Sequence, residues 1–269
     1  MDTNYLNRTN QPWNDSNGYE LYVGRWSKLI SADFVEWLSP QPNLKWLEIG
    51  CGTGALTNEI VSRGAPSYLL AIDRSEAYIE KAREIIRVSN VSFLNTELST
   101  LRLTNEFDHI TSGLVLNFIP QIEQLLLSTM NNLKRGGQIS AFVWDYAGHY
   151  QPMRHFWDAA KDIFDDAHKF DAGTTFSICT RENLVRLFER LNVSRIRFSN
   201  IERIATFRNF EDYWLPIASA QGSVAEFLST LDPEEKNNLK TRLKHRLPIA
   251  FNGEIKLILS ALGIEGTKM

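Results

Sequence analysis

A short apolar run meets a cluster of glycines at Lys45-Trp46-Leu47-Glu48-Ile49-Gly50-Cys51-Gly52-Thr53-Gly54. This pattern predicts a buried strand that turns tightly into a helix. The predicted helix carries Leu56, Ile60 and Val61 on one face and ends at Arg63-Gly64, where the glycine is typical of a helix C-terminus.

The same alternation continues on both sides of this turn. A helix that starts at Trp26 is stopped by Pro40 and Pro42, and Ser75 is the predicted N-cap of a later helix. Further strands are predicted at residues 68–72, 91–95, 107–113 and 138–144, with a helix at residues 120–133. Strands that alternate with helices predict a parallel sheet covered on both faces.

The second half of the chain is less regular. Helices are predicted at roughly residues 153–168, 180–191 and 210–246, and strands at 193–199, 203–207 and 254–259. We expect one α/β domain with a Rossmann-like, doubly wound, mostly parallel seven-stranded sheet, antiparallel C-terminal strands and a helical cap. The expected parts are an arm at 1–24, a core at about 25–147 and 180–269, and cap insertions at about 148–179 and 209–247.

Composition narrows the class of protein. The chain has 269 residues and a net charge of −3, which argues against general binding to nucleic acid or anionic membranes. No apolar run is long enough for a membrane span, and the polar N-terminus lacks the layout of a signal peptide. Cys51 and Cys179 are too few for a disulfide framework or a cysteine-built metal site. We therefore expect a cytoplasmic protein without a metal site.

The glycines lie where a parallel sheet binds its ligand, at the carboxyl end of a strand. Asp73 ends the next predicted strand, where a carboxylate can accept hydrogen bonds from both ribose hydroxyls. The spacing G-x-G-x-G at residues 50–54 differs from the G-x-G-x-x-G of dinucleotide folds. Glu48 would repel a pyrophosphate but suits a cation, which favours S-adenosylmethionine (SAM), with its sulfonium and ammonium, over a nicotinamide dinucleotide.

Residues 47–54, Leu-Glu-Ile-Gly-Cys-Gly-Thr-Gly, closely resemble the first motif of class I SAM-dependent methyltransferases, and the resemblance covers most of the first 150 residues. It implies that Asp73 binds the ribose, that Glu97 binds the adenine amino group, and that the Leu98 amide binds an adenine ring nitrogen. Glu97 departs from the Asp that is commoner there. The other cofactor contacts expected on this basis are Gly50, Cys51 (through its backbone), Gly52, Gly54, Arg74, Ser112 and Gly113, with the last two beside the methionine arm. The segment Tyr22-Val23-Gly24-Arg25-Trp26-Ser27 resembles the family's entry segment, in which the arginine reaches the SAM carboxylate.

Methyl transfer mainly requires that the acceptor and the methyl group be aligned in a dry site. Asn117 follows the fourth predicted strand and is a candidate for orienting the acceptor. His149 follows the fifth and is a candidate base, although a solvated or structural loop residue is the plainer interpretation. Several aromatic residues either roof a pocket for an apolar acceptor or, on the plainer interpretation, pack inside the cap: Phe156, Trp157, Phe164, Phe170, Phe176, Tyr213 and Trp214.

The sequence therefore predicts an enzyme that transfers a methyl group from SAM to an O, N or C atom of a small molecule. Two alternatives stay open. One is a non-catalytic module that binds SAM or a protein partner, because fold does not fix function. The other is an NAD(P)-dependent oxidoreductase, which the glycine spacing and Glu48 disfavour.

Overall fold

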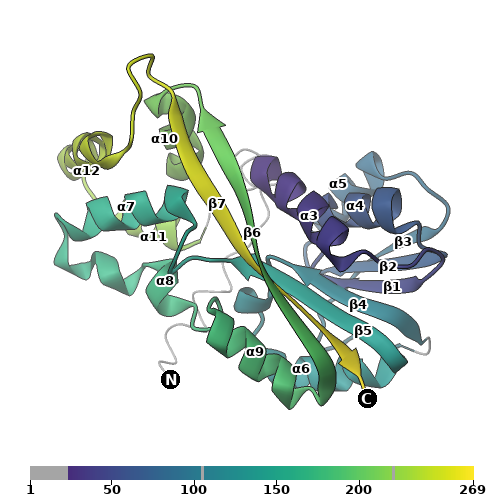
Figure 1. Cartoon of the computed structure of the whole chain (residues 1–269). Coiled ribbons are helices and arrows are strands. Elements are labelled where there is room, and N and C mark those ends of the chain that lie inside the picture. Colours follow the sequence, from purple (N-terminus) through teal and green to yellow (C-terminus); the bar gives the residue numbers. More distant parts are fainter. Residues whose placement is uncertain (1–23, 104–105, 220–221) are drawn as a thin grey trace.

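The computed structural model describes residues 24–103, 106–219 and 222–269, in which strands and helices alternate as predicted (Figure 1). In the first half the elements are α3 (Arg25–Leu38), β1 (Lys45–Ile49), α4 (Ala55–Gly64), β2 (Tyr68–Asp73), α5 (Glu76–Ile85), β3 (Val91–Asn95), β4 (Phe107–Gly113), α6 (Ile122–Thr129) and β5 (Leu133–Trp144). Ser75 is the N-cap of α5 and accepts a hydrogen bond from the Tyr78 amide, so this prediction is confirmed. The arm predicted for residues 1–24 lies outside the described residues apart from Gly24.

The strands form one seven-stranded sheet in the order β3-β2-β1-β4-β5-β7-β6. Strands β1 to β5 pair in parallel, whereas β7 runs antiparallel to both β5 and β6. The predicted fold class is thus confirmed. The chain runs outward from β1 to β3 and then returns to place β4 beside β1. Strand order reverses at this point, which is where open α/β sheets bind their ligands.

Successive residues of each strand enter opposite faces of the sheet. Trp46 packs with α3 and α4 on one face, and its neighbour Leu47 packs with α6 and α9 (Arg181–Arg190) on the other. Leu69 and Leu70 of β2 divide in the same way. Figure 1 shows α3, α4 and α5 on one side of the sheet and α6 and α9 on the other, so both faces are covered.

The last two strands are longer than the sequence suggested. β6 (Val193–Phe207) is one strand where two were predicted, and β7 (Ile255–Lys268) continues well past residue 259. Residues 202–204 are all exposed between buried Ile201 and Ala205, so this stretch lacks the strict alternation that predicts a strand. Gly263 and Gly266 interrupt the apolar pattern of β7, and a Cβ on Gly266 would lie 2.6 Å from Val193 Cγ2. β5 likewise begins at Leu133, five residues before the predicted strand.

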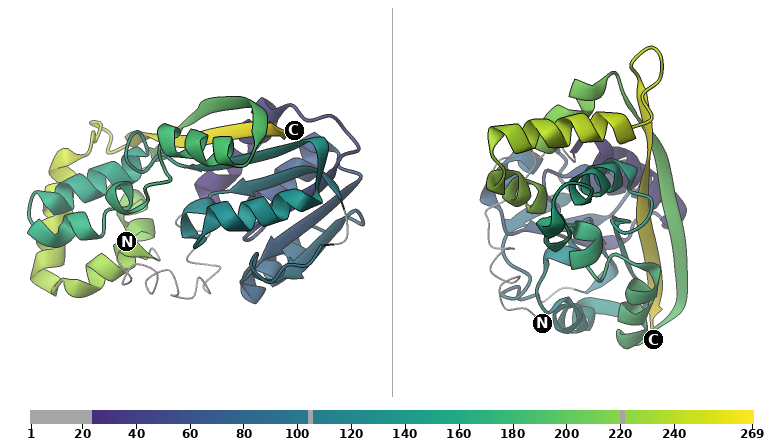
Figure 2. Two further views of the ribbon diagram at one scale, coloured as in Figure 1. Left: turned by 90° about the horizontal axis from the view of Figure 1, so that it is seen from below. Right: turned by 90° about the vertical axis from the view of Figure 1, so that its left-hand side faces the viewer.

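Helices gather beyond the carboxyl end of the sheet, at the left of Figure 1, and Figure 2 shows the same group from two further sides. They are α7 (Gln151–Lys161), the short α8 (Ala172–Thr175), α10 (Phe210–Ala218), α11 (Ser223–Thr230) and α12 (Pro233–Arg246). Phe227 of α11 packs against Phe156 and Trp157 of α7, which gives this group an aromatic core continuous with the α3 face of the sheet.

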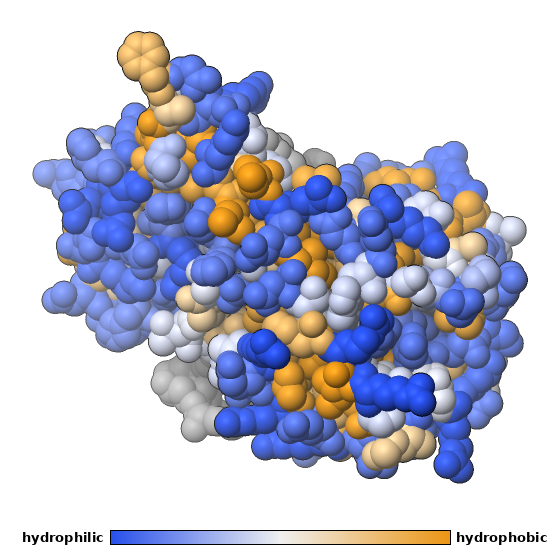
Figure 3. Space-filling view, in the orientation of Figure 1, coloured by the Kyte–Doolittle hydropathy of each residue, from blue (hydrophilic) through white to orange (hydrophobic). Residues whose placement is uncertain are grey.

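Hydrophilic residues cover most of the face drawn in Figure 3, and apolar residues form a narrow band along β6. This edge strand carries charged side chains at Arg195, Arg197, Glu202 and Arg203. Charges on an edge strand disfavour its pairing with the edge of another sheet. In the part of the chain that the structure describes, no helix combines the length and apolar character that crossing a membrane requires.

Candidate functional site

Glycines let the backbone turn sharply after β1. Gly50, Gly52 and Gly54 have φ angles of +71°, +54° and +92°, a backbone conformation that residues with a Cβ rarely adopt. A Cβ on Gly50 would lie only 2.5 Å from Val115 Cγ1. The amides of Gly50 and Cys51 both donate to the Ile72 carbonyl, at 2.8 and 2.9 Å. The turn is thereby tied to the end of β2 and leads directly into α4.

A cavity of about 630 Å³ opens beside this turn, between the carboxyl ends of the strands and the helical group. At its sheet end it is lined by Glu48, Gly50, Cys51, Gly52, Asp73, Arg74, Glu97, Leu98 and Gly113. All nine are residues that were predicted from the sequence to bind the cofactor. Its size is that of a small-molecule site.

Asp73 is held at the end of β2 by backbone donors. The Gly52 amide donates to its Oδ2 at 2.9 Å, and the Ser75 amide donates to its Oδ1 at 2.9 Å. Burial nevertheless raises the pKa of this carboxyl above its usual value, although these two hydrogen bonds act in the opposite direction. Each oxygen keeps a lone pair that can accept a further hydrogen bond from a ligand.

Glu48 lies one strand away and is almost wholly buried, at 1% exposure. Thr57 Oγ1 of α4 donates to its Oε2 at 2.6 Å. The pKa of Glu48 is raised to about 8, chiefly by burial and also by the charge of nearby Asp73, while the Thr57 hydrogen bond acts in the opposite direction. A carboxyl with this pKa changes its charge near neutrality, and a cationic ligand in the cavity would favour the charged form.

The loop after β3 brings Glu97 and Leu98 to the same cavity. The Thr96 amide donates to the Asp73 carbonyl at 2.9 Å, which ties this loop to the end of β2. Ser99 Oγ donates to Glu97 Oε2 at 3.3 Å. Glu48, Asp73 and Glu97, which lie at the ends of three neighbouring strands, therefore face the same cavity.

Two of the proposed cofactor residues that the structure describes, Ser112 and Gly54, do not line the cavity. Ser112 Oγ donates to the Ile49 carbonyl at 2.9 Å and so joins β4 to β1. A Cβ on Gly54 would lie 2.7 Å from Ile86 Cδ1, so this glycine permits α4 and α5 to pack closely. The side chain of Arg25 lies outside the described residues.

Neither catalytic candidate reaches the cavity wall. Asn117 lies on a short 3-10 helix after β4, next to Phe118, which does line the cavity. Its buried amide Nδ2 has no hydrogen-bond partner among the residues that the structure describes. The His149 side chain is 68% exposed, with Nδ1 3.4 Å from Glu202 Oε1. The structure therefore does not bring His149 together with the other site residues.

Aromatic and apolar side chains line the far end of the cavity. Of the seven aromatic residues considered from sequence, Trp157 and Phe176 line it, whereas the rings of Phe156, Phe164 and Phe170 pack around Phe227. Phe118, Tyr146 and Met153 also line the cavity, and they are not among the residues predicted from the sequence. Their position just after β4 and β5, or on the first helix beyond β5, was the available signal.

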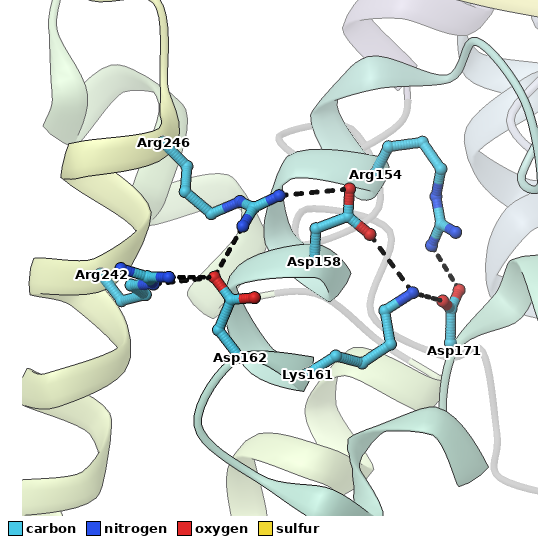
Figure 4. Close-up of polar contacts among 7 residues, drawn as sticks. All are labelled: Arg154, Asp158, Lys161, Asp162, Asp171, Arg242 and Arg246. Atoms are coloured by element: carbon cyan, nitrogen blue, oxygen red, sulfur yellow. Dashed lines mark hydrogen bonds and ion pairs between the residues drawn. The ribbon is translucent and has the colours of Figure 1, made fainter.

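An ion-pair network ties together the helices behind this wall (Figure 4). Asp171, which is fully buried, accepts hydrogen bonds from Arg154, from Lys161 Nζ at 3.1 Å and from the Gly173 amide at 2.9 Å. On the outer side Asp162 accepts from Arg242 at 2.8 Å and from Arg246 at 2.6 Å, which joins α7 to α12. Ala172 and Phe176, just after Asp171, line the cavity, so the network fixes part of its wall.

A family model described as a methyltransferase domain matches residues 40–180, more than half of the chain. This chain belongs to the class I SAM-dependent methyltransferases. The match covers β1 to β5, the glycine turn and Asp73, and it ends at Thr180, the N-cap of α9.

Curated relatives and a solved structure agree with this family. The chain is 29% identical over 163 residues to a malonyl-[acyl-carrier protein] O-methyltransferase of Bacillus cereus, which is 59% of this chain and 60% of that protein. It is 25% identical over 140 residues to a trans-aconitate 2-methyltransferase of Deinococcus radiodurans, covering 51% of this chain and 52% of the other. The chain thus spans about 60% of the first relative and about half of the second. The structure of a phosphoethanolamine N-methyltransferase 2 of Haemonchus contortus in complex with SAM superposes on this chain with a TM-score of 0.61 and 14% sequence identity. The superposition covers 98% of this chain and 59% of that one, which shows a shared fold.

The cavity fits the cofactor of this family. Its sheet end combines a turn that admits a ligand close to the backbone with three acids, Glu48, Asp73 and Glu97, that suit a ligand bearing a sulfonium and an ammonium. A dinucleotide pyrophosphate would instead meet the buried Glu48 across this turn.

Proposed function

We propose that this protein transfers the methyl group of SAM to an O, N or C atom of a small-molecule acceptor. The observation that carries this proposal is the Asp73 carboxylate, which is held by the Gly52 and Ser75 amides and faces the cavity beside the glycine turn. Family membership and the malonyl and trans-aconitate methyltransferase relatives support it.

In this proposal the sheet end of the cavity binds the cofactor. Asp73 accepts hydrogen bonds from the ribose hydroxyls, with Arg74 beside it. Glu97 accepts from the adenine amino group, and the Leu98 amide donates to an adenine ring nitrogen. Glu48 supplies negative charge for the amino-acid end.

Bound SAM supplies a methyl group already activated on sulfur. The chain then has to hold the acceptor in line and exclude water, which is a task for the cavity wall rather than for a catalytic triad. We keep Asn117 as the candidate for orienting the acceptor, although its side chain does not line the cavity, because it precedes Phe118 of the wall in the chain and its buried amide Nδ2 lacks a partner among the described residues. His149, exposed beside Glu202, is the weaker candidate.

We further propose a single methyltransferase domain with cap segments at about 148–179 and 209–247 that acts in the cytoplasm on free small molecules rather than on nucleic acid. Two free, buried thiols, Cys51 and Cys179, support a reducing compartment. The net charge of −3 supports the exclusion of nucleic acid.

Formation of S-adenosylhomocysteine (SAH) tests this function. The protein is incubated with methyl-labelled SAM and pooled small-molecule fractions, and the amounts of SAH and of labelled product are both measured. We expect both to form in equal amounts with wild type and to fall at least tenfold in Asp73→Ala. Tight binding of SAM without any SAH across all fractions would instead indicate a non-catalytic binding module.

A further inference from the structure

The cap end of the cavity presents rings that the protein leaves partly uncovered. Phe118, Tyr146 and Phe176 are each only half-buried although they lie inside the cavity wall. Phe176 contacts Phe118 edge to face, with ring centroids 5.2 Å apart, and lies 5.6 Å from Tyr146. These three rings come from three segments, the loop after β4, the loop after β5 and the chain after α8. They form one continuous apolar wall, here called the ring wall.

The ring wall is extended by residues that are firmly held. Trp144 stacks on Tyr150 at 4.3 Å with a 10° angle between the rings, and Tyr150 meets Tyr146 edge on. Met153 and Trp157 of α7 add apolar surface to the same end of the cavity. Because these side chains are packed from behind, the wall is a preformed surface.

Among the residues that the structure describes, those that bring charge to the cavity lie at its opposite end. Among the described residues, the charged ones that line it are Glu48, Asp73, Arg74 and Glu97, all at the ends of β1 and β2 or just after β3. Behind the wall, Arg154 and Lys161 pair with Asp171, and Arg242 and Arg246 pair with Asp162 (Figure 4). At the cap end no described residue that lines the cavity is a cation, so none there would pair with a carboxylate on the acceptor.

On the basis of the proposed function, we infer that the methyl acceptor is an uncharged molecule with a flat, apolar body, such as an aromatic ring system, that carries the hydroxyl or amine to be methylated. Its apolar body covers the ring wall, which gains the free energy of removing that surface from water. In the reaction the sulfur–methyl bond breaks, an oxygen–methyl or nitrogen–methyl bond forms, SAM becomes SAH, and the proton of the acceptor passes to solvent. This acceptor class differs from the polycarboxylate named for the Deinococcus radiodurans relative.

The test uses prodan, an uncharged fluorescent naphthalene ketone, titrated into wild-type protein saturated with SAH. We expect micromolar binding that Phe118→Ala and Phe176→Ala each weaken by about tenfold, the effect of uncovering part of one ring. Phe251→Ala is the matched control, because Phe251 is fully exposed and lies outside the cavity. Trans-aconitate in excess should not displace prodan. SAH formation should appear with a naphthol and not with trans-aconitate.

Calorimetry with SAH separates the possible failures. A variant that still binds SAH is folded, and its prodan affinity is then measured directly. If an alanine variant does not bind SAH, Phe176→Leu, which keeps apolar volume without the ring, is measured in its place. Displacement of prodan by trans-aconitate, or equal prodan affinity in all variants, would overturn the inferred acceptor class while leaving SAM binding intact. Failure of the wild-type protein to bind SAH would instead refute the proposed function.

Discussion

Glu48 should make the stability of this protein fall as pH rises through neutrality. Burial raises its pKa in the folded protein from 4.5 to about 8. Between these values the unfolded chain has lost the proton that the folded chain retains, so the folded state binds more protons and stability decreases with increasing pH. The slope is up to about 1.4 kcal/mol per pH unit, so this one carboxyl lowers the free energy of unfolding by about 2–3 kcal/mol between pH 6 and pH 8.

Glu48→Gln removes this titration and keeps an acceptor for the Thr57 hydroxyl. We expect its free energy of unfolding, measured by urea denaturation, to stay higher than that of wild type by an amount that grows with pH over this range. Subtracting the two profiles cancels groups that titrate in both proteins, including His109, whose pKa burial lowers to about 3. Glu80→Gln, on the exposed face of α5, is the control and should follow wild type.

The same carboxyl should couple pH to cofactor binding. A cationic ligand favours ionised Glu48, so the SAM dissociation constant should fall as pH rises from 6 towards 8, and Glu48→Gln should abolish this trend. Parallel stability profiles of wild type and Glu48→Gln between pH 6 and pH 8 would refute this explanation of the buried acid.

Two further predictions concern the turn and the cap. Gly50→Ala combines a φ of +71° with a Cβ 2.5 Å from Val115, and should weaken SAM binding at least tenfold in calorimetry; Gly136→Ala, with φ +75° and open space around its Cβ, should leave SAM binding unchanged. Asp171→Asn removes a fully buried carboxylate that pairs with Arg154 and Lys161, and should lower the free energy of unfolding by about 3 kcal/mol in urea denaturation. Asp162→Asn, in the more exposed outer pairs, should cost less than about 1 kcal/mol; equal losses in both variants would contradict the inner pairs' larger role.

The sheet end of the site could be predicted from sequence because its residues follow strands directly. Once the run at Lys45–Ile49 is recognised as a buried strand, the glycines and Asp73 must meet at one edge of a parallel sheet. Local periodicity, a turn and chain connectivity suffice for that conclusion, and the structure places Glu48, Gly50 and Asp73 around one cavity.

The cap end could not be predicted in the same way. Phe118, Tyr146 and Phe176 meet through tertiary packing of three segments that share no periodic pattern, so nothing local distinguishes a ring at the cavity from a ring in the core. His149 shows the converse: it follows a strand at the correct edge, yet the loop directs its side chain to solvent beside Glu202.

Calorimetric titration with SAM, SAH and NADH tests the central claim most directly, using wild type, Asp73→Ala and Asp108→Ala. Asp108 also accepts a backbone hydrogen bond, from the Lys45 amide at 2.8 Å, but lies at the opposite end of the sheet and so controls for loss of a carboxylate that accepts from the backbone. The account predicts micromolar binding of SAM and SAH by wild type and Asp108→Ala, a loss of at least tenfold in Asp73→Ala, and no heat with NADH. Binding of NADH with none of SAM, or SAM binding unaffected by Asp73→Ala, would contradict it.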